Sequence, residues 1–313
     1  MLLYKIIFII FFLPLFFKLT LAPFSVWVVR IYAALPLLFL LFLMTFYKII
    51  YFFIFFKIFN FFFSLIPGYN IFSLICLVLG ISSIFIGCLA YRKQDLKSVL
   101  AYTTISQMGY ILIGLSQMSL IIEKFSFFYL FMYAFHLIII ITIFYLLRVK
   151  YFFTNLNELF LVKSFNIYYY YILFFCFLSL AGVPPLVGFF MKYYLLVALY
   201  QTGYSFIVFF LIIASFIMSI IYLQILLQIM TEKNINFFVF YQNHFKGLQS
   251  LFDFSVTRIF FQYFIKIFVS FLNSFFLFLL FFSIFYSQNI FYFFGLLVSL
   301  VNFNFLILNV FFI

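Results

Sequence analysis

Three lysines stand inside apolar stretches that are long enough to cross a lipid bilayer. They are Lys18, Lys48 and Lys192, each near the middle of its stretch. A lysine at the centre of a membrane helix costs about 2.5–3.5 kcal/mol on insertion scales, so such residues usually face a bundle interior or a water-filled path. One of them could snorkel or pair for structure alone, but three together favour a path for protons through the protein.

The stretch 179–200 combines its lysine with two prolines, Pro184 and Pro185, which stand eight and seven residues before Lys192. Proline removes a backbone donor and costs about 3 kcal/mol inside a helix. Non-helical backbone is tolerated at membrane depth only where protein buries it or water lines it. The stretch therefore predicts a broken helix beside an interior charge. Prolines also flank Lys18, which predicts the same arrangement there.

His136 lies near the middle of another apolar stretch. It could be a hydrogen-bonded core residue or a member of a proton relay, for which an unperturbed pKa of about 6.5 is suitable. The polar run on 98–118 leaves similar alternatives, helix packing or the lining of a water chain: Thr103, Thr104, Ser106, Gln107 and Tyr110. We expect the acidic residues in loops or at span ends, out of reach of mid-membrane: Asp95, Glu123, Glu158, Glu232 and Asp253.

The composition excludes a soluble globular fold. Of 313 residues, 70% are hydrophobic and 7% are charged, which is typical of an all-α, polytopic transmembrane bundle. We expect a surface helix in the polar interval 231–266, and the apolar stretch 290–313 could cross or pack at the edge. The expected spans are 5–28, 34–57, 70–91, 98–118, 125–147, 168–200, 204–230 and 267–286.

Charge and small residues refine this topology. With these spans, the loops on one side carry eleven basic residues, and the other side has only Lys5, Lys57 and Lys124, in its loops or at the ends of the spans. The positive-inside bias places the rich side in the cytoplasm or the mitochondrial matrix, so the net charge of +12 indicates membrane lipids rather than nucleic acid as partners. The small residues on 70–91 predict close helix packing: Gly80, Ser82, Ser83 and Gly87.

The cysteines offer no cofactor chemistry. Cys76, Cys88 and Cys176 lie in apolar stretches without a CxxC pair, which predicts inert core thiols. Nothing in the chain has the spacing of a metal, nucleotide or iron–sulfur site.

Three motifs carry a resemblance to a known family: KLTLAPFSVW from Lys18 to Trp27, QDLKSVLAYTTISQMGYILIGL from Gln94 to Leu115, and SLAGVPPLVGFFMKYYLL from Ser179 to Leu196. Together with the thirty-residue step from Lys18 to Lys48, they resemble the antiporter-like membrane subunits of respiratory complex I, over the chain to about residue 230. The resemblance implies two inverted five-helix repeats, each with a broken helix. It also implies a proton relay through the family's seventh-, eighth- and twelfth-helix lysines, which match Lys18, Lys48 and Lys192.

The resemblance also implies how the chain is organised. Residues 1–66 correspond to the last two helices of the first repeat, 67–230 to the second repeat, 231–266 to a polar loop and 267–313 to one or more C-terminal membrane helices. About six helices precede Lys18 in the family, one of them with a glutamate partner for the seventh-helix lysine. We expect a separate chain to supply them. The loop PFSVWVVRIY departs from the family's PFHxWxPDVY by lacking its His and Asp.

Within the family, the branch called subunit 2 of NADH dehydrogenase is favoured, because the subunit 4 branch typically has glutamate in place of Lys192. This implies a proton-translocating subunit of NADH:ubiquinone oxidoreductase in the mitochondrial inner membrane, beside other membrane-arm subunits. NADH, flavin, iron–sulfur clusters and ubiquinone would be bound by those other subunits. A non-pumping structural scaffold and a stand-alone cation/proton antiporter subunit stay open as alternatives.

Overall fold

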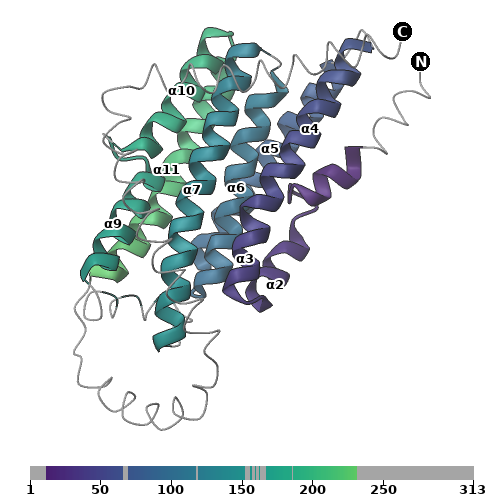
Figure 1. Ribbon diagram of the computed structural model, residues 1–313. Coiled ribbons are helices and arrows are strands. Elements are labelled where there is room, and N and C mark those ends of the chain that lie inside the picture. The colour runs from purple at the N-terminus through teal and green to yellow at the C-terminus, as the bar shows by residue number, and fades with distance from the viewer. Residues whose placement is uncertain are drawn as a thin grey trace.

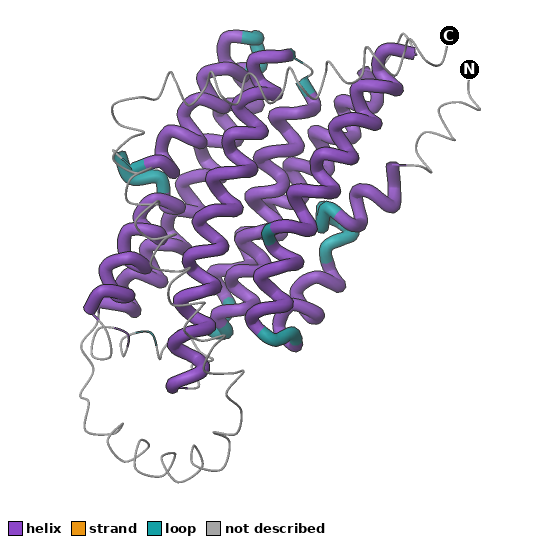
Figure 2. The backbone as a smooth tube through the Cα atoms, viewed as in Figure 1, coloured by secondary structure: helices purple, strands orange, loops and turns teal. Residues whose placement is uncertain are grey.

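The computed structural model describes residues 12–65, 70–117, 119–151, 167–184 and 186–230, together with Leu156, Leu159 and Val162. The elements in these ranges are helices joined by short loops (Figure 2). The expected surface helix and the stretches 267–286 and 290–313 lie outside the described residues. Residues 12–18 are helical, and the later elements are α2 (Val26–Ala34), α3 (Leu37–Met44), α4 (Phe46–Leu65), α5 (Asn70–Gly87), the 3₁₀ helix η1 (Cys88–Arg92), α6 (Leu96–Ser116), α7 (Leu120–Tyr151), α9 (Ile167–Ala181), α10 (Val187–Gln201) and α11 (Ser205–Met230).

Five helical stretches among the described residues are long and apolar enough to cross a membrane, and they confirm five of the expected spans. The first of them joins α3 and α4. The chain is therefore an all-helical, multi-pass membrane protein. The five stretches are Leu37–Phe59, Ser73–Arg92, Leu96–Ser116, Ile121–Leu147 and Ser205–Met230.

The expected span 5–28 is not one helix. The helical segment 12–18 ends at Lys18, and α2 starts only at Val26. Pro23 lies in this break. Its missing backbone N–H therefore costs no hydrogen bond of a helix. Arg30, which the sequence places in a loop, lies within α2, because the second half of the span extends further than the apolar pattern suggests.

The expected span 168–200 is broken as predicted. Its first half, α9, ends at Ala181, and its second half, α10, begins at Val187. Pro184 lies between them. Both broken helices therefore carry a lysine close to the break, at Lys18 and Lys192.

The two helices α6 and α7 form the centre of the bundle (Figure 1). The membrane-length windows of α6 and α7 are 94% and 78% buried, against 33% for each of the other three spans. α7 packs against α3 and α4 on one side and against α9 and α10 on the other. A side chain on α7 can therefore link the regions that contain the two breaks.

Small residues set the distance between α5 and α6. A Cβ at Gly109 of α6 would lie 2.1 Å from Ser83 Oγ and 2.6 Å from Gly80 O of α5. A Cβ at Gly80 would lie 2.5 Å from a side-chain carbon of Ile113. The predicted close packing around Gly80 is confirmed, because these helices approach to a distance that only glycine allows.

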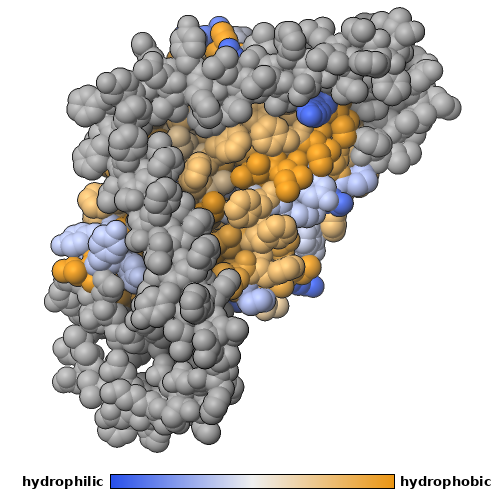
Figure 3. All heavy atoms as spheres, in the orientation of Figure 1, coloured by the Kyte–Doolittle hydropathy of each residue, from blue (hydrophilic) through white to orange (hydrophobic). Residues whose placement is uncertain are grey.

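The surface of the described residues is largely apolar. On the face in Figure 3, orange side chains cover much of the described area. Exposed side chains on α3, α4, α5 and α11 include Phe39, Ile50, Phe85 and Phe216. Surfaces of this kind face lipid or neighbouring membrane helices rather than water.

Gly109→Ala should separate α5 from α6. Alanine is about 1 kcal/mol better than glycine in a helix, but here its Cβ overlaps backbone, and overpacking costs about 1–3 kcal/mol. We expect a lower melting temperature of the purified protein in detergent. Gly114→Ala on the same helix is the control, because its nearest atoms are side-chain carbons at 3.2 Å. Equal destabilisation of both variants would contradict this account of the contact.

Candidate functional site

Lys192 lies on α10, and its side chain reaches back across the break to the end of α9. Its Nζ donates hydrogen bonds to Leu180 O at 2.9 Å and Ala181 O at 3.2 Å. The last carbonyls of a helix have no partner within it, and the helix dipole makes this end partly negative. The side chain is only 9% exposed, so the protein provides Lys192 with a buried site that stabilises positive charge.

Two glycines shape this site. Gly182 has a φ of +91° and ends α9 in a Schellman-type turn, in which Val183 N–H donates to Leu178 O. Gly188 brings the start of α10 against α9, because a Cβ there would lie 1.5 Å from Ser179 O. The break is therefore an ordered turn that is held by its own backbone hydrogen bonds.

Lys48 lies on α4 in a different environment. It is completely buried, and no described group forms a hydrogen bond with its Nζ. It follows Thr45, whose φ of −113° and ψ of −80° interrupt the helix between α3 and α4. An unpaired buried ammonium is costly, and an ionisable group inside a membrane domain is by default a candidate for function.

Lys18 contacts the same helix. Its half-buried Nζ donates to Tyr51 Oη at 2.9 Å and lies 4.7 Å from the centre of the Tyr51 ring. Tyr51 stands three residues after Lys48 on α4, which is about one helical turn. The structure therefore brings the first two of the three lysines to neighbouring turns of one helix.

His136 is completely buried on α7, as expected for either of its two interpretations. Its Nδ1 lies 2.6 Å from Met132 O, so the geometry assigns the ring proton to Nδ1, which donates to that carbonyl. The bond ties the ring to the backbone of its own helix, one turn earlier. Its part in a proton relay stays a prediction.

A buried hydrogen-bond network joins α6, α7 and α11, and the sequence did not predict its long-range members. Tyr129 Oη donates to Gln107 Oε1, and Gln107 Nε2 donates to Tyr222 Oη at 3.2 Å. Tyr110 stacks on Tyr129 with ring centres 6.1 Å apart and donates to Leu211 O at 3.2 Å. The network supports a fixed arrangement of the three helices.

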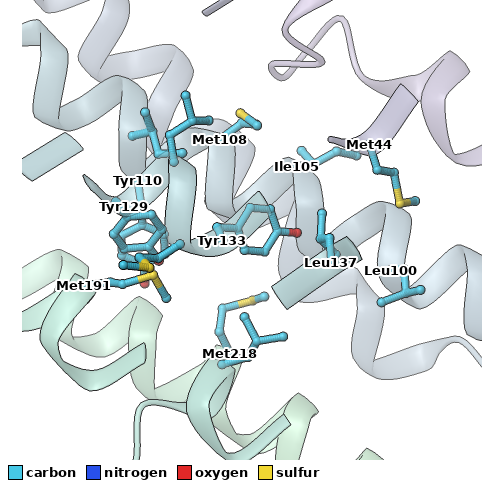
Figure 4. Packing of buried hydrophobic residues seen from close by; sticks show 14 of the residues in the cluster. Met44, Leu100, Ile105, Met108, Tyr110, Tyr129, Tyr133, Leu137, Met191 and Met218 are labelled. Atoms are coloured by element: carbon cyan, nitrogen blue, oxygen red, sulfur yellow. The ribbon is translucent and has the colours of Figure 1, made fainter. Parts of the chain in front are cut away.

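Figure 4 shows how the α7 tyrosines lie relative to the lysine-bearing helices. Met191, the residue before Lys192, lies near Tyr129, whereas Met44 lies beyond Tyr133 on the other side. The contacts of α7 with α10 and with α3 agree with this order. Because Met44 precedes Lys48 by four residues, the line of candidate residues runs from α4 through α7 to α10.

The hydroxyl groups of α6 form hydrogen bonds with backbone carbonyls of the same helix. Thr103, Thr104 and Ser106 each donate to the carbonyl three residues earlier, at distances of 2.7–3.0 Å. This favours helix packing over a water chain for these three residues. Gln107 and Tyr110 differ, since they reach α7 and α11.

The expectation that every acidic residue lies in a loop or at a span end is confirmed for Glu123, which lies in the first turn of α7 at the start of the span Ile121–Leu147. Its burial was not predicted, because the side chain is only 4% exposed. Ser119 marks the start of the helix, since its Oγ accepts the N–H of Ile122 at 3.3 Å, as an N-cap residue does. Asp95 also lies at a span end, at the N-cap of α6, and it makes no side-chain capping bond. Glu158, Glu232 and Asp253 lie outside the described residues.

The cysteines occupy ordinary packing positions. Cys76 and Cys176 are buried in the core, and Cys88 is half-buried in η1. Within the described ranges, no group of three His, Cys, Asp or Glu side chains could hold a metal ion.

The fold and site together define a class of membrane protein. Broken helices at membrane depth, with charged groups at the breaks, are the ion sites of many helical transporters. The family described as NADH:quinone oxidoreductase/Mrp antiporter, TM, matches residues 2–218, and the chain belongs to it.

Individual relatives agree with this assignment. NADH-quinone oxidoreductase subunit N 2 of Thermodesulfovibrio yellowstonii is 31% identical over 210 residues, which cover 66% of this chain and 45% of that protein. The chain spans about half the length of the curated relatives it matches.

Two solved structures share the fold. The Mrp complex from Dietzia sp. DQ12-45-1b aligns with a TM-score of 0.61 and 24% identity, over 69% of this chain and 39% of the matched chain. Respiratory complex I from Thermus thermophilus aligns with a TM-score of 0.58 and 22% identity, over 71% of this chain and 49% of the matched chain.

Gly182→Ala and Gly203→Ala form a matched pair of variants. Both glycines have a φ of +91°, so alanine is strained at either position by about 1–2 kcal/mol. A Cβ at Gly182 would lie 3.3 Å from Lys192 Nζ, whereas a Cβ at Gly203 would meet nothing within 4 Å. We expect similar losses of thermal stability, but in an assay of the proton translocation proposed below only Gly182→Ala should show a lower rate. Equal translocation by the two variants would show that the turn does not position Lys192.

Proposed function

We propose that this chain is a proton-translocating membrane-arm subunit of an NADH:ubiquinone oxidoreductase. The observation that carries the proposal is the pair of buried lysines, Lys48 and Lys192, on helices that flank α7 in a member of this family. Relatives named as subunits of NADH-quinone oxidoreductase support the same function.

The mechanism we propose uses the different surroundings of the lysines. A lysine in apolar surroundings changes its protonation readily when a nearby charge moves. The Lys192 ammonium has two carbonyl acceptors, whereas Lys48 has no partner in the described part of the chain. Protons would pass from Lys18 to Lys48 and on to Lys192, with His136 assisting between α4 and α10.

We further propose that the chain is the subunit 2 branch of the family and acts in the mitochondrial inner membrane. Lysine at position 192, where the subunit 4 branch typically has glutamate, supports the branch. The 62 Phe and 25 Tyr residues are typical of an AT-rich organellar genome and support the location. Other subunits would bind NADH, flavin, iron–sulfur clusters and ubiquinone.

The helix breaks support the division of the chain that the sequence suggested. One break lies beside Lys18, within 1–66, and the other beside Lys192, within 67–230. We therefore propose that these ranges are the end of a first repeat and a complete second repeat. The ranges 231–266 and 267–313 would be the connecting loop and the C-terminal membrane part.

Lys18→Met, Lys48→Met and Lys192→Met test the relay, because methionine preserves side-chain length and removes the charge. In the intact complex, we expect each to slow proton translocation by about tenfold, equivalent to about 1.4 kcal/mol in the barrier. Lys57→Met, at an exposed position on α4, is the control and should translocate normally.

Other outcomes would favour one of the two alternative functions, the non-pumping scaffold or the stand-alone antiporter. Unchanged translocation in all three lysine variants would leave the scaffold as the function. Cation-driven proton exchange in vesicles that contain the chain without redox subunits would instead indicate an antiporter.

We infer that additional helices cover the side of the bundle formed by residues 12–18, α2, α3 and α4. Exposed apolar side chains gather there: Leu13, Phe17, Val26, Ile31, Phe39, Phe42, Phe46 and Ile50. The matched relatives are about twice as long as the matched region, which supports the presence of such helices. We propose that a separate chain supplies them and brings a carboxylate to Lys18.

Mass spectrometry of the purified complex checks this arrangement. We expect a second polypeptide that contains the helices of the first repeat, and a photo-reactive residue at Phe39 should cross-link to it. The same group at Phe216, on α11, should not. An intact full-length subunit 2 in the same preparation would contradict the separate chain.

A further inference from the structure

A stripe of polar side chains continues along α7 from His136 to the start of the helix. Its members follow one another at steps of three or four residues, so they lie along one side of the helix. All are buried, with exposed fractions of 0–4%. Thirteen residue steps separate the two ends of the stripe on the helix, or about 20 Å at 1.5 Å per residue. It consists of Glu123, Ser126, Tyr129, Tyr133 and His136.

The Oε2 atom of Glu123 has no hydrogen-bond partner among the described residues. A buried polar atom without a partner costs about 1–3 kcal/mol, and a carboxylate in a membrane domain costs more than a neutral group. Side chains placed at such a cost are suited to exchanging protons with water or with each other.

The position of Glu123 relates it to Lys192. Ser126 Cβ and Leu195 Cδ1 each lie 3.2 Å from the point that a Cβ of Gly114 would occupy, so α6, α7 and α10 meet there. Leu195 is about one turn beyond Lys192 on α10, and Glu123 is about one turn from Ser126 on α7. Glu123 therefore lies between the level of Lys192 and the membrane face where α10 ends and α7 begins.

This membrane face is the one whose loops are poor in basic residues. Lys124 is the neighbouring cation, and it is half-buried. By the positive-inside bias, this face is opposite the cytoplasm or matrix. A group between Lys192 and this face would lie on the release side of the relay.

We propose that the polar stripe of α7 is a proton outlet and that Glu123 is its terminal proton-exchanging group. A proton from Lys192 converts the Glu123 carboxylate to a neutral carboxyl. The carboxyl then releases the proton to water at the face where α7 begins, which restores the carboxylate. Tyr129 and Tyr133 line the route with hydroxyl groups. The outlet rests on the proposed function, because it receives its protons from the lysine relay.

Glu123→Gln in the intact complex tests the outlet, since the amide keeps the size of the side chain but cannot carry the proton. We expect proton translocation to fall by a factor similar to that in Lys192→Met, while uncoupled NADH oxidation persists. Glu123→Asp restores a carboxyl group and should recover part of the translocation. Lys124→Gln changes the adjacent charge and should translocate normally.

Infrared difference spectra provide a readout that a purely structural residue would not change. During turnover, we expect a carboxyl C=O band that disappears in Glu123→Gln and shifts in Glu123→Asp. Normal translocation by Glu123→Gln, together with loss in Lys192→Met, would overturn the outlet and leave the proposed function intact. Equal losses in Glu123→Gln and Glu123→Asp, without a carboxyl band, would assign Glu123 a structural role and also overturn the outlet.

Discussion

Backbone carbonyls and ammonium groups are costly in a membrane when they have no hydrogen-bond partner. At the break between α9 and α10, the two kinds of group pair with each other. When α9 ends at Ala181, its last carbonyl groups lose their helical partners. Lys192 donates to two of them. The turn at Gly182 and the close approach at Gly188 hold the helix end and the lysine in this relation. The break and the charge therefore stabilise each other.

The same residue type has three different environments in this chain. Lys18 contacts a tyrosine hydroxyl and ring, Lys48 is buried without a partner in the described residues, and Lys192 is held by carbonyl groups. If the three sites were identical, each lysine would have the same affinity for a proton, and nothing would favour transfer in one direction. In the proposed relay, these unequal sites would allow a moving charge to shift a proton from one lysine to the next.

Tight packing fixes the helices around α7, the helix that links the lysine-bearing parts of the bundle. The glycine contacts between α5 and α6 and the network around Gln107 fix the helices that enclose α7. Because α7 contacts α3 and α4 as well as α10, it is the helix on which the proposed path between the lysines depends. The proposed outlet on its polar stripe would extend that path toward one face of the membrane.

The sequence alone determined the helical membrane class, five spans, both breaks and the lysines beside them. These features follow from local properties: the length of apolar runs, the missing donor of proline and the cost of a charge in lipid. The N-cap at Ser119 is a local signal for the start of α7 just before Glu123, but only the packing of the helices buries that side chain. The tertiary structure decided that Lys18 meets Tyr51, that Lys192 meets the end of α9, and that Gln107 joins Tyr129 to Tyr222. Gln107 and Tyr222 are 115 positions apart, and which side chains pair over such separations depends on how the helices pack, which no local pattern encodes.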